Sequence, residues 1–194
     1  MKVKALLLLA VAALPMAGCA NDGSGTPGAG TSPTSTATTG TGSAGRDGCL
    51  IGTWNVDVND MAQQTATKMG RGATGTGTGT ITLIFGDQMT IKYNNAIAID
   101  SPIGSGLTMN MKNTFAGDAT STDWTAKDGK LAGTMPANTV TSTIVTTVGG
   151  KEVPATTTPL SGSLDMSSGA LGYTCGGNKA TLITPMVTWN LTKA

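Results

Sequence analysis

The chain has 194 residues and a near-neutral charge balance, with 12 Lys and Arg against 11 Asp and Glu, and it contains no His. The missing His removes the commonest general base and metal ligand, together with the Ser-His-Asp and Cys-His catalytic arrangements. The charge balance provides no basic surface for nucleic acid. We therefore expect a non-enzymatic protein without a cofactor, a metal site or a nucleic-acid partner.

The N-terminus has the order of a bacterial export signal. Lys2 and Lys4 precede an apolar run over residues 5–14, and Leu14-Pro15-Met16-Ala17-Gly18-Cys19 follows. This order resembles the lipobox of bacterial lipoproteins, with Met in the place where Leu is commonest. The resemblance implies that residues 1–18 are a signal peptide and that Cys19 carries the lipid anchor. An ordinary secretory signal, which would leave this Cys as a free thiol, is the alternative.

The expected location follows from this lipid anchor. An acylated Cys19 becomes the new N-terminus and holds the protein on the extracytoplasmic face of the cell membrane, so the membrane is the first expected partner. From Cys19 to Gly48 the chain consists almost wholly of Gly, Ser, Thr, Ala and Pro. Such a segment buries too little apolar surface to offset its ordering entropy, so residues 19–48 are predicted to be a disordered tether with a reach of roughly 30 Å.

Residues 49–194 are long enough for one compact domain with its own core. This domain contains two Cys, Cys49 at its start and Cys175 near its end. Because an exported compartment permits disulfides, we expect these two residues to pair. The loop that they would close is long, and the chain-entropy relation gives a stabilisation of roughly 4–5 kcal/mol. Two separate buried thiols are the alternative.

A period of two, carried by Val, Ile, Thr and aromatic residues, dominates the domain and predicts half-buried antiparallel strands. The clearest alternations lie at 54–58, 89–93, 107–112 and 187–192, and further strands are expected over 77–85, 119–126, 130–135, 139–148, 161–165, 171–175 and 180–184. Turn-forming pairs separate the strands, among them Asn94-Asn95 and Gly117-Asp118.

Residues 59–70 interrupt the strand pattern and are predicted to form a short helix. Asn59 or Asp60 would cap its start, and Gly70 would end it. The Gly-Thr alternation over residues 72–80 then leads into a strand. Its early part has few side chains that could pack, so we expect that part to be mobile.

Two short motifs suggest a fold family. Gly52-Thr53-Trp54 opens the first predicted strand, and Thr122-Asp123-Trp124 comes later in the chain. They resemble the G-x-W and T-D-Y motifs of lipocalins and related calycin barrels, with Trp124 in place of the Tyr. The resemblance implies that Trp54 packs across the closed end of a barrel. The Arg that packs on this Trp in the family is missing, and Lys193 is its nearest substitute.

The general layout also resembles that of actinobacterial lipoproteins. A tether is followed by Cys49-Leu50-Ile51-Gly52-Thr53-Trp54 and, late in the chain, by Gly172-Tyr173-Thr174-Cys175 and a final strand containing Trp189. This second likeness implies no activity.

About ten antiparallel strands must protect their edges, either by closing into an up-and-down barrel or by stacking as a sandwich. We favour the barrel, because a Cys49–Cys175 bond would join the two ends of the sheet. The predicted fold class is therefore all-β: an antiparallel up-and-down, lipocalin-like β-barrel with one short helix, preceded by a signal peptide and a disordered linker.

Met and aromatic side chains occupy several positions on the predicted inner faces. Because Met adapts to varied apolar ligands, these positions are candidates for a binding cavity in a barrel. The candidate residues for binding a lipid or other apolar small molecule are Trp54, Met89, Ile91, Tyr93, Met109, Met111 and Trp124. The alternative is that they fill a solid core, in an envelope module that binds a protein partner or has a structural role.

Overall fold

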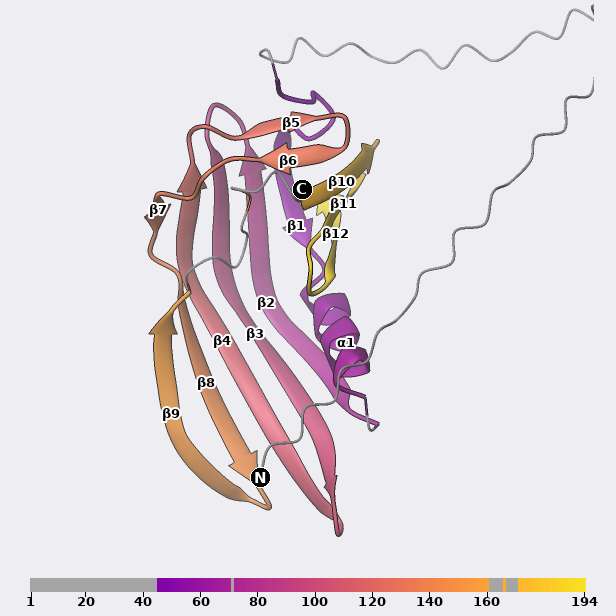
Figure 1. Ribbon diagram of the computed structural model, residues 1–194, viewed down its shortest axis with the longest axis vertical. Helices are drawn as coiled ribbons and strands as arrows, with labels where there is room; N and C mark the ends of the chain where they lie inside the picture. The colour runs from indigo at the N-terminus through magenta and orange to yellow at the C-terminus, as the bar shows by residue number, and fades with distance from the viewer. Residues whose placement is uncertain (1–44, 71, 161–165, 167–170) are drawn as a thin grey trace, which may run out of the picture. The chain divides into compact units, whose positions relative to one another are not determined.

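The computed structural model describes residues 45–70, 72–160, 166 and 171–194 (Figure 1). The predicted signal peptide, Cys19, almost all of the predicted tether and the strand predicted at 161–165 lie outside the described residues. The last residues of the predicted tether are described. There, the Arg46 guanidinium donates hydrogen bonds to the carbonyl oxygens of Gly86 and Asp87, at 3.2 and 3.0 Å. The segment just before residue 49 therefore packs against the domain.

Twelve strands form one sheet in the described part of the chain, and every strand pair in it is antiparallel. The strands are β1 Gly52–Val56, β2 Thr74–Phe85, β3 Met89–Gly104, β4 Leu107–Ser121, β5 Thr125–Lys127, β6 Lys130–Ala132, β7 Ala137–Asn138, β8 Thr141–Val148, β9 Lys151–Pro159, β10 Leu171–Gly176, β11 Lys179–Ile183 and β12 Thr188–Lys193. With the helix α1, Val58–Met69, they confirm the predicted all-β class with one short helix.

The sheet curls into a half-barrel (Figure 1). Its strand order is β5-β6-β10-β11-β12-β1-β2-β3-β4-β8-β9, with β7 paired to β4 outside this path. The long strands β2, β3, β4, β8 and β9 form a curved wall, and the short strands β10 to β12 and the helix α1 lie across from it. The concave side of this wall holds the core.

Helix α1 starts one residue earlier than predicted. Asp57 is the N-cap, because its carboxylate accepts a hydrogen bond from the Asp60 backbone N–H at 2.9 Å. Neither Asn59 nor Asp60, the predicted caps, occupies that position, and Val58 lies in the helix rather than in a strand. The predicted end is confirmed: Gly70 is the C-cap with a φ of 66°, a conformation that favours Gly.

Two of the predicted turns are wrong. Strand β3 passes straight through Asn94-Asn95, and β4 passes through Gly117-Asp118. The two strands pair continuously from Met89 opposite Ser121 to Pro102 opposite Thr108, so the ladder of backbone hydrogen bonds outweighs the local preference of these residues for turns. Instead the chain reverses after β3, around Ser105, which has a φ of 52°.

The Gly-Thr run leads into a strand as predicted, but β2 already begins at Thr74, so the strand includes most of the early part that we expected to be mobile. Its glycines are the contact surface for α1. A Cβ atom on Gly75 would overlap the carbonyl oxygen of Ala62, and one on Gly77 would overlap that of Val58. The missing side chains therefore let the helix backbone rest directly on the strand.

The packed core contains buried residues from α1 and from strands β1 to β6 and β10 to β12. Trp54 is fully buried there, and its indole N–H donates to the Leu50 carbonyl oxygen at 2.6 Å. Lys193 lies opposite Trp54 in the β1–β12 pairing, and its Nζ stands 5.4 Å from the centre of the indole ring. A basic residue thus packs on this Trp, in the arrangement for which Lys193 was the expected substitute.

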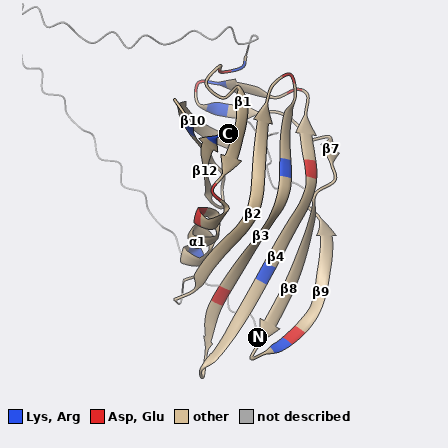
Figure 2. Ribbon diagram, turned by 180° about the vertical axis from the view of Figure 1, so that it is seen from behind, with Lys and Arg blue, Asp and Glu red and all other residues tan. Residues whose placement is uncertain are grey.

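Charged side chains are sparse on the long strands and carry both signs (Figure 2). Lys92 and Asp100 lie on β3, and Lys112 and Asp118 lie on β4; all four are exposed. This mixture offers no strongly charged surface that would attract one class of charged partner.

Candidate functional site

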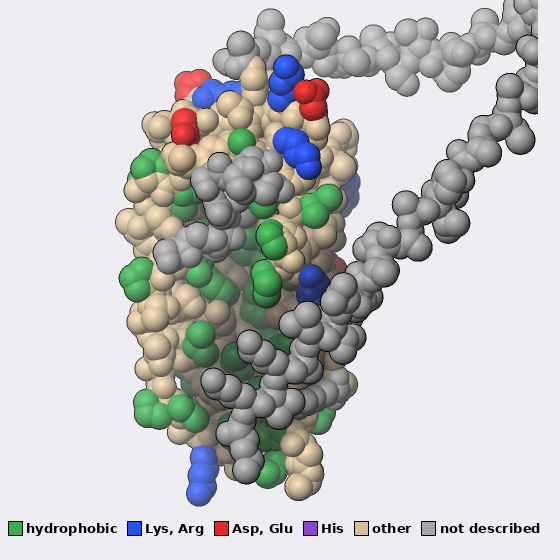
Figure 3. Space-filling view, viewed as in Figure 1, with side chains coloured by type: hydrophobic (Ala, Val, Ile, Leu, Met, Phe, Trp, Pro, Cys, Tyr) green, Lys and Arg blue, Asp and Glu red, His purple; other side chains and the backbone are tan. Residues whose placement is uncertain are grey.

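A cavity of about 500 Å³ lies on the concave side of the half-barrel. Met61 of α1, Ile81 of β2, Ile97 of β3, Phe115 of β4 and Trp189 of β12 contribute to its lining. Figure 3 shows apolar side chains gathered along the hollowed middle of this face. The volume is within the range of about 300–1,000 Å³ that is typical of small-molecule sites.

Alternate side chains of strand β3 form one wall of this cavity. Tyr93, Asn95 and Ile97 follow one another on the inner face, because successive side chains of a strand point to opposite sides. Asn95 is opposite Gly79 of β2 and opposite Phe115 of β4. Gly79 therefore places no side chain beside Asn95, and a Cβ atom there would overlap the carbonyl oxygen of Asn94.

Besides Tyr93 and Thr184, which carry hydroxyl groups, two amide side chains interrupt the apolar lining. Asn95 is 4% exposed, and neither its Nδ2 nor its Oδ1 has a hydrogen-bond partner among the described residues. Asn113, the diagonal neighbour of Asn95 on β4, accepts a hydrogen bond on its Oδ1 from the Ser142 hydroxyl at 2.8 Å. The cavity is thus an apolar site with a small polar centre on β3 and β4.

The structure divides the seven predicted ligand residues among three environments. Tyr93 lines the cavity. Four are buried in the packed core and do not contribute to the cavity lining: Trp54, Met89, Ile91 and Trp124. Met109 and Met111 are half-buried on β4, outside the lining, near the end of the strand that pairs with Val148 and Thr146.

Most residues that line the cavity were not predicted from the sequence. Interpreting Asn94-Asn95 as a turn hid the fact that Tyr93, Asn95, Ile97 and Ile99 continue a single alternation. That period was visible in the sequence and would have placed Asn95 on the inner face. The contribution of the β11–β12 connection, with Pro185 and Met186, had no comparable signal, because it depends on how distant segments pack.

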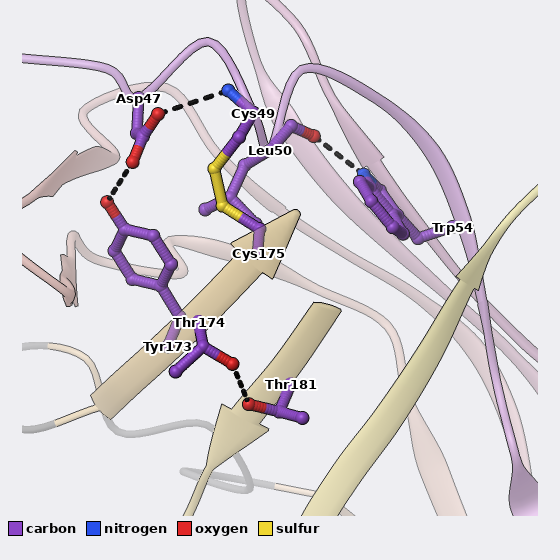
Figure 4. Close-up of a disulfide and its surroundings, with 8 residues drawn as sticks. All are labelled: Asp47, Cys49, Leu50, Trp54, Tyr173, Thr174, Cys175 and Thr181. Atoms are coloured by element: carbon purple, nitrogen blue, oxygen red, sulfur yellow. Dashed lines mark hydrogen bonds between the residues drawn. A yellow bond between two sulfur atoms is a disulfide. The ribbon is translucent and has the colours of Figure 1, made fainter. Parts of the chain in front are cut away.

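A second cluster surrounds the Cys49–Cys175 disulfide (Figure 4), which confirms the predicted pairing. The two Cα atoms are 5.9 Å apart. The Asp47 carboxylate accepts hydrogen bonds from the Cys49 backbone N–H at 3.1 Å and from the Tyr173 hydroxyl at 3.0 Å. Asp47 and the two sulfurs lie within 4.8 Å of one another, but the disulfide occupies both thiolates that a metal ion would need.

The disulfide does not join the two ends of the sheet, as the argument for barrel closure assumed. It connects the segment before β1 with β10, and these strands are separated in the sheet only by β11 and β12. The ends of the strand path are β5 and β9. The curl of the sheet therefore comes from its strand pairing and twist, and the disulfide fastens the region around Cys49 to one side of the half-barrel.

The Tyr173 hydroxyl is expected to make stability depend on pH in the alkaline range. Burial, reinforced by the hydrogen bond to Asp47, raises the pKa of Tyr173 to about 12, against about 10 in an unfolded chain. The contribution to stability is complete below about pH 10 and is lost as the pH rises toward 12, because the unfolded chain ionises first. Urea unfolding at about pH 8 and about pH 11 should show a smaller loss of stability for Tyr173→Phe than for the wild type. An equal loss in the two proteins would contradict this prediction.

No protein-family model, curated protein or solved structure matches this chain. Within the described residues, no helix is long and apolar enough to cross a membrane.

Proposed function

We propose that this protein is a lipid-anchored exported protein that binds a lipid or another apolar small molecule in its half-barrel, without catalysing a reaction. The observation that carries the proposal is the apolar cavity of about 500 Å³ on the concave face. An apolar ligand would displace water from this lining, and the burial of apolar surface contributes roughly 25 cal/mol per Å². Affinity would therefore come mainly from the hydrophobic effect.

The anchor half of the proposal depends on Cys19. A lipid chain on this residue would hold the domain on the extracytoplasmic face of the cell membrane, and the Gly-rich segment that follows would let it move near the bilayer. Such a position suits a protein whose ligand dissolves poorly in water. Radiolabelled palmitate should enter the wild-type protein and not Cys19→Ala, and failure to label the wild type would remove the anchor.

A second candidate function is an envelope module that binds another protein. Strand β9 favours it, because all nine residues from Lys151 to Pro159 are exposed and β9 is one end of the strand path. An exposed edge can pair with a strand of a partner. However, Pro154 lies within this strand and cannot donate a backbone hydrogen bond, which weakens such pairing. The cavity therefore supports ligand binding as the better candidate.

Filling the cavity is expected to abolish binding of apolar probes. Ile97→Trp adds a large side chain at a lining position, whereas Ile103→Trp makes the same change at an exposed position near the end of β3. The fluorescence of N-phenyl-1-naphthylamine should rise when wild type or Ile103→Trp is added. The increase with Ile97→Trp should be smaller by a factor of at least about ten. Equal binding by all three proteins would place the probe elsewhere, and no binding by the wild type would contradict the proposed function.

A further inference from the structure

We infer that Asn95 and Asn113 bind the polar head of the ligand, and that this head is uncharged and contains both a hydrogen-bond donor and an acceptor, as in a fatty amide. This inference rests on the proposed function, since it specifies which apolar molecule the cavity selects. Its basis is the polar centre on β3 and β4 together with the chemistry of the surrounding lining.

Asn95 is the first observation. A buried amide normally finds partners for its oxygen and nitrogen, because an unsatisfied polar group in an apolar environment is costly. Here both amide atoms are buried at a cavity wall and have no partner among the described residues. One NH₂ donor and one C=O acceptor are thus available together, and a group of the same kind on a ligand would satisfy both at once.

Asn113 provides a second donor beside the first. The hydrogen bond from Ser142 engages its Oδ1 and thereby orients the amide, so the Nδ2 group is left for another acceptor. Asn95 and Asn113 are diagonal neighbours across the β3–β4 pair, at a spacing of about 7–8 Å between their backbones. A single carbonyl group between them can therefore accept from both side chains.

The residues that line the cavity favour a ligand with an uncharged head group. Among the described residues that form the cavity wall, none carries a charged side chain. A carboxylate or phosphate placed next to Asn95 would lose its hydration without gaining a cation, and the burial of an unpaired charge is far more costly than that of a neutral amide. A neutral amide exchanges its hydrogen bonds with water for hydrogen bonds with Asn95 and Asn113 at little cost.

The apolar part of the ligand would lie along the remaining wall. Ile81, Ile97, Phe115 and Trp189 also line the cavity, and Met61 of α1 adds a flexible side chain. A hydrocarbon chain fits such a surface without specific contacts. The site thus combines one fixed polar position with a permissive apolar region.

Competition among ligands with the same C18 chain tests this inference. With the full chain carrying Cys19→Ala, which cannot be acylated, oleamide should displace N-phenyl-1-naphthylamine at concentrations about tenfold lower than oleate or 1-octadecene. Asn95→Leu should lower the affinity for oleamide about tenfold and leave that for 1-octadecene unchanged. Asn94→Leu, the same change on the exposed neighbouring residue of β3, should behave like the unsubstituted protein.

The outcomes separate the two proposals. If the fluorescent probe binds but oleamide has no advantage, or if Asn95→Leu leaves oleamide affinity unchanged, the inference fails and the proposed function stands. If no apolar probe binds, the proposed function itself fails. Asn95→Leu should melt at the same or a higher temperature than the wild type, because it removes an unsatisfied buried amide. Should it fail to fold, Asn113→Leu must show the same loss of preference for oleamide, and an unchanged preference would overturn the inference.

Discussion

Loss of the Cys49–Cys175 disulfide is expected to lower the free energy of unfolding by about 4 kcal/mol. The bond joins residues 126 positions apart, so its removal frees nearly the whole domain in the unfolded state. The measurement is guanidinium unfolding of wild type and Cys49→Ser, with and without dithiothreitol. The two proteins should differ under oxidising conditions and coincide under reducing ones.

Cys19→Ser is the control for this experiment, because it makes the same chemical change outside the described domain. Its unfolding curve should match the wild type under oxidising conditions. The loss also has a local component, since the bond joins the segment of Asp47 and Cys49 to β10, where the Tyr173 hydroxyl donates to the Asp47 carboxylate. If Cys49→Ser and the oxidised wild type unfold at the same denaturant concentration, the disulfide contributes nothing to stability.

Adding a single methyl group to β2 where it contacts α1 should also lower the free energy of unfolding strongly. Gly77→Ala would place a Cβ atom on the Val58 carbonyl oxygen, and Gly75→Ala would place one on that of Ala62. Both obstacles are backbone atoms of the helix, so no side-chain rotation relieves the overlap and the helix must move off the strand. We expect each substitution to cost about 3 kcal/mol or more.

Gly176→Ala is the matched control for the glycine substitutions. Gly176 also lies in a strand, is exposed, and has no heavy atom within 4 Å of the position that a Cβ would take. Thermal melting followed by circular dichroism should show a much lower melting temperature than that of the wild type for Gly75→Ala and Gly77→Ala. The melting temperature of Gly176→Ala should be almost unchanged. Similar melting temperatures for all three variants would mean that α1 does not rest on β2.

Several features of the fold could be predicted because they depend on neighbouring residues alone. Alternating apolar and polar side chains indicated most of the strands, and Gly70 marked the end of the helix correctly. The Cys49–Cys175 pair followed from counting the Cys residues that an exported domain would contain. Period, cap and composition are local properties, so the sequence was sufficient for them.

The features that failed are those in which a distant contact outweighs a local preference. Asn94-Asn95 has a strong preference for a turn, yet pairing with β2 and β4 on both sides keeps it extended. The Gly-Thr run has the composition of a mobile segment, but its bare face is the surface on which α1 packs. In both cases the energy that decides the conformation comes from residues far away in the sequence.

The sequence by itself determined an all-β domain with one helix and a pair of Cys residues suited to a disulfide. It also predicts an export signal that ends in an acylated Cys, which stays a prediction. Only the tertiary structure decided where the cavity lies and that Asn95 is buried in its wall. The physical reason is that a cavity is the space left between elements that pack, here α1, the adjacent strands β2 to β4, strands β10 and β12, and the β11–β12 connection. No single stretch of the chain contains that space.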